Sequence, residues 1–175
     1  MIIRQAKIEH ATASADCLFL AMEDIAYQLC GESDANKAKS FLKHFVVLEN
    51  NQYSYQNCWV ITADEKVIGA MNVYDGAQLT ELREPILSFI KANQERSFFM
   101  ENETESGEFY IDCIGINTDQ QGKGIGSKAL NFLIDEYLVK NNQTLGLLVD
   151  EENPNAKRLY IKLGFKVVGN KTLAG

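Results

Sequence analysis

A run of β-forming residues is followed by a glycine-rich loop and then by an amphipathic helical pattern. The run, Phe109–Ile116, is nearly continuous in β-formers, which is typical of a strand at the centre of a sheet. The loop reads QGKGIGSK from Gln121 to Lys128. Glycines there let backbone N–H groups face outward, and the start of the following helix adds partial positive charge. This segment therefore predicts an anion-binding site suited to a phosphate or pyrophosphate.

Two nucleotide-binding motifs can be compared with this loop. The P-loop requires GxxxxGK[ST], and no pair of glycines here has that spacing. The dinucleotide-binding pattern GxGxxA does match Gly124–Ala129, and Asp150 ends the next expected strand. However, residues 117–123 separate the strand from these glycines, and only one further strand is expected after Asp150. One further strand is too few for a doubly wound sheet. If the loop is considered alone, the simplest alternative to an anion-binding site is a glycine-rich connection that binds no ligand.

The spacing of apolar residues predicts alternating strands and helices along the whole chain. The expected strands are 2–6, 58–62, 67–74, 109–116, 144–149 and 165–168. The expected helices are 9–30, a second one that Ser33 or Asp34 can cap and that reaches Val46, 79–92, one after the glycine loop with its buried side over 129–138, and 154–163. We therefore predict an α/β fold, in which helices flank a central mixed sheet of antiparallel and parallel strands. No shift in composition separates one part from another, so residues 1–175 are predicted to form one domain.

The composition limits the partners that the chain can have. It has 17 basic and 24 acidic residues and a net charge of −7, which argues against nucleic acid as a partner and fits a cationic one. Its four cysteines and two histidines have no zinc-ligand spacing, so no metal is expected. No apolar stretch is long enough to span a membrane, and the first residues do not resemble a signal peptide. We therefore expect a cytoplasmic protein with no membrane partner, and a homodimer is left open.

Two motifs resemble those of the GCN5-related N-acetyltransferase (GNAT) superfamily. Gln121, Gly124 and Gly126 fit the pattern Q/R-x-x-G-x-G/A, and Asn153–Phe165 fits N-x-x-A-x-x-L-Y-x-K-x-G-F. The resemblance is strong over residues 109–168 and only topological before them. It implies the acyl-CoA N-acyltransferase fold, in which two neighbouring parallel strands splay apart and the pantetheine arm of acetyl-CoA lies in the gap.

The same resemblance implies roles for individual residues. Acetyl-CoA is the implied co-substrate, without a metal. Tyr160 matches the tyrosine near the CoA sulfur, where a phenol can protonate the departing thiolate. The positions that match CoA-binding residues are Ile114, Ile116, Gln121, Gly122, Lys123, Gly124, Ile125, Gly126, Ser127, Asn153, Ala156 and Tyr160.

The amine must also lose a proton, and the central strand carries the candidates for accepting it. Alternate residues of a strand share one face, which predicts that Glu108, Tyr110, Asp112, Ile114 and Ile116 all point the same way. Asp112 is then the first candidate for the base or for orienting the amine, and Glu108 is the second. Tyr110 stands where some family members carry a glutamate, which leaves the base open. An equal alternative is a structural role, in which Asp112 accepts backbone hydrogen bonds at a sheet bulge. Cys113 is expected to face away from Asp112, as a small core residue.

A long connection, about 76–107, is inserted before the central strand and contains its own helix and an acidic tract. The tract is expected to form either a negatively charged entrance for a cationic amine or a solvated loop.

We predict an acetyl-CoA-dependent N-acetyltransferase that transfers the acetyl group directly to a primary amine of a cationic small molecule. The alternatives are an acetyltransferase for protein or peptide N-termini or lysines, and an acyl-CoA-binding sensor without catalysis.

Overall fold

A five-stranded mixed sheet lies at the centre of the protein in the computed structural model, which describes residues 1–172. Its strand order is β1-β2-β3-β4-β5. The first four strands pair antiparallel and β5 pairs parallel to β4, which confirms the predicted mixed sheet. The strands are β1 Ile2–Gln5, β2 Cys58–Ala63, β3 Lys66–Asp75, β4 Phe109–Ile116 and β5 Leu145–Gly146.

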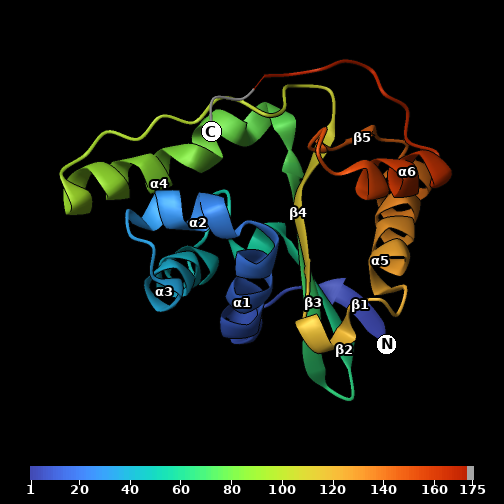
Figure 1. Cartoon of the computed structure of the whole chain (residues 1–175), viewed down its shortest axis with the longest axis horizontal. Coiled ribbons are helices and arrows are strands. Elements are labelled where there is room, and N and C mark those ends of the chain that lie inside the picture. Colours follow the sequence, from blue (N-terminus) through green and yellow to red (C-terminus); the bar gives the residue numbers. More distant parts are fainter. Residues whose placement is uncertain (173–175) are drawn as a thin grey trace.

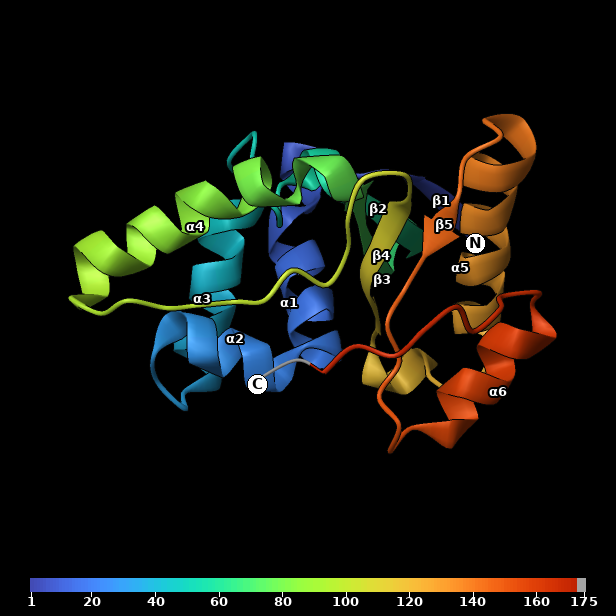
Figure 2. The ribbon, with the colours of Figure 1, turned by 90° about the horizontal axis from the view of Figure 1, so that it is seen from above.

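Helices cover both faces of this sheet (Figure 1). Helices α1 to α4 lie on one side of β4, and α5 and α6 lie on the other (Figure 2). A π-helical stretch, Ile134–Lys140, continues α5. The helices are α1 Ala11–Ala21, α2 Glu23–Cys30, α3 Ala35–Val46, α4 Leu79–Gln94, α5 Ile125–Leu133 and α6 Pro154–Lys162.

Each helical layer encloses its own hydrophobic core. The first core lies between the sheet and α1–α4 and includes Leu18, Leu29, Leu42, Phe45, Val60, Ala70 and Ile86. The second core lies under α5 and includes Ile61, Met71, Val73, Ile111, Ala129, Leu130 and Leu133. The sheet is therefore buried on both faces, which explains why β3 and β4 are so rich in apolar residues.

Local residues fix where several elements begin and end. Asp34 caps α3, because its carboxylate accepts hydrogen bonds from the N–H groups of Asn36 and Lys37. The predicted single helix over 9–30 is wrong at Met22, whose backbone (φ −140°, ψ 42°) separates α1 from α2. The break lets both helices place apolar side chains in the first core, among them Leu18 before it and Leu29 after it.

The C-terminal strands differ most from the prediction. Only Leu145–Gly146 of the predicted strand 144–149 pairs with β4, and residues 165–168 do not form a strand. Val167 and Val168 are 61% and 99% exposed, and the chain continues without helix or strand to Lys171. The Lys171 ammonium there donates hydrogen bonds to the carbonyls of Asn102 and Glu103. Residues with β propensity stay unpaired unless a strand edge accepts their N–H and C=O groups.

No helix within residues 1–172 has the length and apolar content to cross a bilayer.

Candidate active site

The parallel strands β4 and β5 form a fork. They pair only at Phe109 with Leu145 and at Tyr110 with Gly146. From Ile111 to Ile116, β4 keeps β3 on one side, and within residues 1–172 no strand pairs with its other edge. Backbone N–H and C=O groups are strong hydrogen-bonding groups, so this open edge can pair with an extended ligand that carries amides.

The glycine loop lies at the end of the open edge. Gly122 (φ 75°) and Gly124 (φ 73°) have left-handed backbones. Among residues 1–172, only the adjoining residues come within 4 Å of the position that a Cβ would take on either glycine. Gly124 is the N-cap of α5, so the first N–H groups of that helix are available to an anion. The Gln121 amide donates a hydrogen bond to the carbonyl of Ile116 (3.1 Å) and ties the loop to β4.

The second motif forms helix α6. Asn153 caps this helix by accepting a hydrogen bond from the N–H of Ala156 (3.1 Å), and Pro154 occupies its first turn. Both Asn153 and Ala156 therefore have a local structural role. Tyr160 is half-buried beside the second core, with its ring 6.0 Å from that of Phe165. Its hydroxyl makes no hydrogen bond within residues 1–172, and burial raises its pKa, which keeps it protonated.

A β-bulge interrupts β4 at Asp112. Asn72 pairs with Cys113 and the next residue of β3, Val73, pairs with Ile111, so Asp112 is an extra residue without a partner. The predicted common face is therefore wrong. Ile114 and Ile116 pack against the second core, whereas Tyr110 and Cys113 contact buried residues on the opposite side of the sheet.

Asp112 is held in a network of polar side chains on the first-core side of the sheet. Its Oδ1 accepts hydrogen bonds from Gln52 Nε2 and from the Tyr74 hydroxyl, both at 3.2 Å. Gln52 Nε2 also lies 3.2 Å from the Tyr74 hydroxyl. The bulge therefore directs the Asp112 carboxylate into a largely buried polar cluster. The structural role proposed from the sequence placed Asp112 at a bulge with backbone donors. The bulge is present, but the two donors are side chains.

Glu108 occupies a different position, at the fork itself. The Thr104 hydroxyl donates a hydrogen bond to Glu108 Oε1 (2.6 Å). A Cβ on Gly146 would overlap with the Glu108 carboxylate, so this side chain lies across the β5 backbone. The two candidate bases are thus separated, with Glu108 at the fork and Asp112 in the cluster beside Tyr74.

The sequence profile of the acetyltransferase (GNAT) family matches residues 22–165. The chain belongs to this family. A crystal structure of an acetyltransferase superposes on the GNAT chain with a TM-score of 0.82 and 28% identity, over 99% of this chain and 93% of that one. An N-acetyltransferase from Staphylococcus aureus Mu50 shares the fold, with a TM-score of 0.75 and 21% identity over 99% and 94% of the two chains.

A curated relative matches a shorter stretch of this GNAT protein. Spermidine N(1)-acetyltransferase of Escherichia coli (strain K12) is 42% identical over 55 residues. That stretch covers 31% of this chain and 30% of the relative.

The surroundings of Asp112 in this GNAT protein oppose its ionisation. Desolvation, followed by the charge of Glu103, raises the pKa of Asp112 to about 6, against the opposing effects of Gln52, Tyr74 and Arg83. Cys113 does not face away from Asp112 as predicted, since it packs against the first core, on the side of the sheet where the Asp112 network lies. Burial, followed by the charge of Asp112, raises the pKa of the Cys113 thiol. Adjacent residues on the same side of a strand are a consequence of the bulge.

We expect the Asp112→Asn variant to gain stability relative to the wild type as the pH rises from about 4 to above 6. The pKa of Asp112 is higher in the folded than in the unfolded protein, so the folded state binds more protons in this window and the wild type loses stability with rising pH. Urea unfolding at several pH values measures the difference between the two proteins. A difference that stays constant over this window would contradict the assigned environment of Asp112.

Sequence reasoning missed three members of the network, namely Gln52, Tyr74 and Arg83. Arg83 gave a detectable signal, because it interrupts the apolar face of α4 between Leu79 and Ile86. The acidic tract is not simply a solvated loop. Glu103 forms an ion pair with Arg83 (2.5 Å), and Thr104 is buried.

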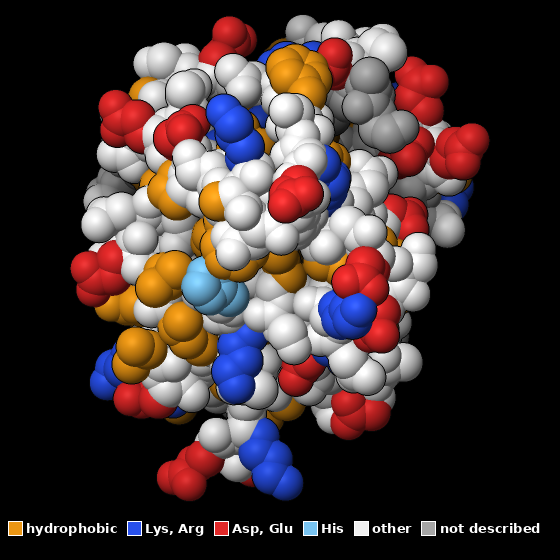
Figure 3. Space-filling view, turned by 90° about the vertical axis from the view of Figure 1, so that its left-hand side faces the viewer, with side chains coloured by type: hydrophobic (Ala, Val, Ile, Leu, Met, Phe, Trp, Pro, Cys, Tyr) orange, Lys and Arg blue, Asp and Glu red, His pale blue; other side chains and the backbone are white. Residues whose placement is uncertain are grey.

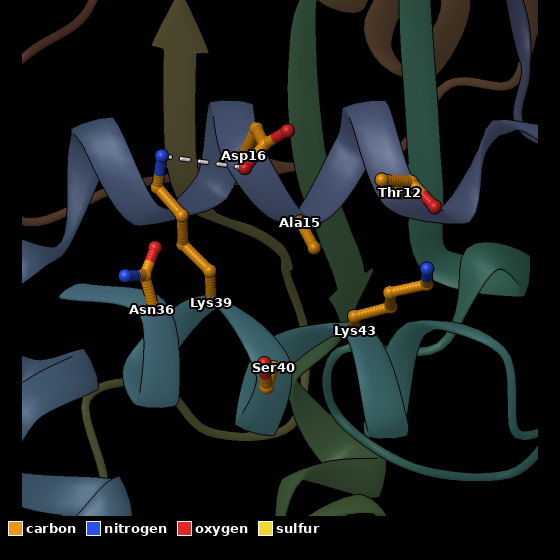
Figure 4. A pocket seen from close by; sticks show the side chains of 7 residues that line it. All are labelled: Thr12, Ala15, Asp16, Asn36, Lys39, Ser40 and Lys43. Atoms are coloured by element: carbon orange, nitrogen blue, oxygen red, sulfur yellow. Dashed lines mark ion pairs between the residues drawn. The ribbon is translucent and has the colours of Figure 1, made fainter. Parts of the chain in front are cut away.

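The surface of the GNAT protein carries hollows elsewhere. One lies between α1 and α3 (Figure 4), where Lys39 and Asp16 form an ion pair at 3.4 Å. None of the candidate site residues lines it. Figure 3 shows the end of the molecule formed by the helical layer on the first-core side, where hydrophobic, acidic and basic side chains are interspersed. The candidate active site is therefore assigned on the open edge of β4 and the glycine loop rather than on a surface hollow.

Proposed function

We propose that this GNAT protein transfers the acetyl group of acetyl-CoA directly to a primary amine of a cationic small molecule. The observation that carries the proposal is the open edge of β4, which ends at the glycine loop. An arm with two amides, such as pantetheine, fits an unpaired strand edge, and a pyrophosphate fits the N-terminus of α5. Ile114 and Ile116 would offer their backbone to the arm, and residues Gln121 to Ser127 would hold the pyrophosphate.

The proposed chemistry needs two proton transfers. The amine nitrogen attacks the thioester carbon, and collapse of the tetrahedral intermediate breaks the C–S bond. Tyr160 is half-buried, and its hydroxyl has no hydrogen-bond partner among residues 1–172; it would give its proton to the departing thiolate. An alkylammonium has a pKa near ~10 and must first lose a proton. Asp112, with a pKa of about 6, accepts a proton at neutral pH more readily than an ordinary aspartate does, and Glu108 at the fork is the second candidate.

The charges around Asp112 support a cationic acceptor. The cluster contains the carboxylates of Asp112 and Glu103 and one buried cation, Arg83, which leaves it with one net negative charge. An ammonium group placed beside Asp112 would balance that charge. The short match to a spermidine N(1)-acetyltransferase makes spermidine the first acceptor to test.

The proposal is tested by incubating the protein with acetyl-CoA and a panel of amines, and by measuring thiol release together with the mass of the product. The panel contains spermidine, short diamines, amino sugars, a lysine peptide and a peptide with a free N-terminus. We expect turnover on a polyamine or another small cation. Turnover on peptides alone would replace the small molecule with a protein acceptor. Tight CoA binding without turnover on any amine would support a sensor.

We expect the Tyr160→Phe variant to bind CoA normally and to transfer the acetyl group more slowly. The change removes only the hydroxyl, and a general acid typically contributes about 10²–10⁴-fold. A single-turnover rate is the appropriate measurement, because slow product release would hide the effect in kcat. Tyr137→Phe is the matched control, since its hydroxyl lies at β2 and accepts a hydrogen bond there from the Trp59 indole (3.2 Å). Equal single-turnover rates for Tyr160→Phe and the wild type would remove Tyr160 from the mechanism.

A further inference from the structure

Arg83 is a buried cation on the apolar side of α4. It is 3% exposed, and its neighbours one turn away on the helix, Leu79 and Ile86, are buried. A buried guanidinium is costly unless acceptors surround it. Nη2 contacts Glu103 Oε2 at 2.5 Å, Nη1 donates to the carbonyl of Glu101 at 2.9 Å, and Nε donates to Gln52 Oε1 at 3.1 Å.

These contacts determine which way the Gln52 amide points. Arg83 can only donate hydrogen bonds, so Gln52 must turn its oxygen toward Arg83. Its nitrogen then faces the other way, where Nε2 donates to Asp112 Oδ1. An ionised Asp112 can only accept hydrogen bonds, so it requires the same orientation. The reversed amide would place oxygen against carboxylate and nitrogen against guanidinium.

The backbone of Gln52 is also fixed. Gln52 is 1% exposed, its N–H donates to the carbonyl of Leu82 (2.8 Å), and its carbonyl accepts from Asn72 Nδ2 (2.9 Å). Through Gln52, the segment that carries Glu103 is therefore connected to the bulge in β4 by direct hydrogen bonds between side chains. No water or mobile group is needed to complete this chain of contacts.

We propose that Arg83 and Glu103, acting through Gln52, are positioning residues that set the orientation and the charge of the Asp112 carboxylate. The connection between β3 and β4 thereby becomes part of the acceptor side of the site. This inference rests on the proposed function for what Asp112 does in catalysis. The positioning itself is a property of the folded protein and can be measured without any substrate.

Glu103 and Arg83 are two charged groups that shift the pKa of Asp112. Phenols and thiols from the loop before β2 and from β2, β3 and β4 also interact with Asp112. Burial raises the pKa of each, so these groups stay neutral near pH 7. They are Tyr53, Cys58, Tyr74, Tyr110 and Cys113. Glu103 favours the protonated form of Asp112 and Arg83 favours the ionised form. Neutralising each one should therefore move the titration of Asp112 in opposite directions.

The experiment follows the ¹³C resonance of the Asp112 carboxyl during a pH titration of the full chain, assigned by its absence in Asp112→Asn. We expect Arg83→Met to raise the titration midpoint and Glu103→Gln to lower it. Lys91→Met and Glu84→Gln are the matched controls, since both side chains are exposed on the same helix, and their midpoints should equal that of the wild type. If Arg83→Met does not fold, the double variant Arg83→Met/Glu103→Gln removes both buried charges, and its midpoint should lie closer to the wild type than that of Glu103→Gln does.

A second measurement separates this inference from the proposed function. With spermidine or another accepted amine, the acidic limb of kcat/KM should shift in the same directions as the carboxyl resonance. Opposite shifts of the resonance without turnover on any amine would support the positioning and reject the catalytic role. Two results would overturn the positioning. One is a midpoint that moves in the same direction in Arg83→Met and in Glu103→Gln, and the other is a midpoint that moves in neither Glu103→Gln nor the double variant. A purely structural ion pair would change stability alone.

Discussion

The Gly115→Ala variant is expected to lose much of the free energy of unfolding. A Cβ at this position of β4 would overlap with the carbonyl oxygen of Cys17 in α1. Backbone atoms cannot rotate away as a side chain can, and the Cys17 thiol also donates a hydrogen bond to Asn117 just after β4 (3.3 Å). Overpacked cores typically lose 1–3 kcal/mol, and we expect about 3 kcal/mol or more here because α1 must move as a whole. Urea unfolding measures the loss.

Gly126→Ala is the control for this prediction. Gly126 lies in the first turn of α5, and no other atom of the described chain, apart from its neighbours and the helix backbone, lies within 4 Å of the position that its Cβ would take. Alanine is the better helix former by up to about 1 kcal/mol, so the free energy of unfolding should stay equal or rise slightly. If Gly115→Ala were as stable as Gly126→Ala, the close packing of α1 on β4 would be wrong.

The second large effect is expected at the glycine loop, where Gly124→Val should weaken CoA binding at least about a hundredfold, or about 2.7 kcal/mol. The φ of Gly124 is 73°, a conformation that β-branched residues rarely adopt. The loop would have to change its backbone, and the N–H groups at the start of α5 would no longer converge on a phosphate. Isothermal titration calorimetry with CoA gives the affinity, and circular dichroism shows whether the variant is folded.

Gly31→Val is the control that separates the effect of backbone strain from the loss of the phosphate-binding N–H groups. Gly31 has a similar φ of 79° at the end of α2, on the opposite side of the sheet from α5 and α6. The atoms nearest to its Cβ would be the ends of the Gln94 and Arg96 side chains, which can move aside. This variant should lose stability and retain its affinity for CoA. Unchanged CoA binding by a folded Gly124→Val protein would refute the assignment of the loop.

The parts of the fold that could be predicted from the sequence depend on local signals. The strand Phe109–Ile116 and the glycine loop could be predicted because consecutive residues there have a strong preference for one backbone conformation. The cap at Asp34 has the same origin. The bulge at Asp112 does not, because it is defined by which residues of β3 stand opposite. One extra residue reversed the predicted direction of Ile114 and Ile116 relative to Tyr110.

Pairing between distant segments explains the other differences. Residues 165–168 have the composition of a strand, but their sequence does not say whether an edge is available to pair with them. Likewise, Arg83 on an apolar helix face indicates a buried partner without identifying it. The partners, Glu103 and Gln52, lie twenty and thirty-one residues away along the chain in opposite directions, and only the folded protein brings them together.

The short pairing between β4 and β5 divides the molecule into parts of unequal local stability. The antiparallel strands are joined by long ladders, whereas the chain from Leu145 onward meets the sheet through two residue pairs and the packing of the second core. Segments with few backbone hydrogen bonds open at a lower free energy than the rest of a protein. A ligand that pairs with the open edge of β4 would supply hydrogen bonds there, and by mass action it would favour the closed form. The region that binds the ligand would then also be the region whose amide hydrogens the ligand protects from exchange with solvent.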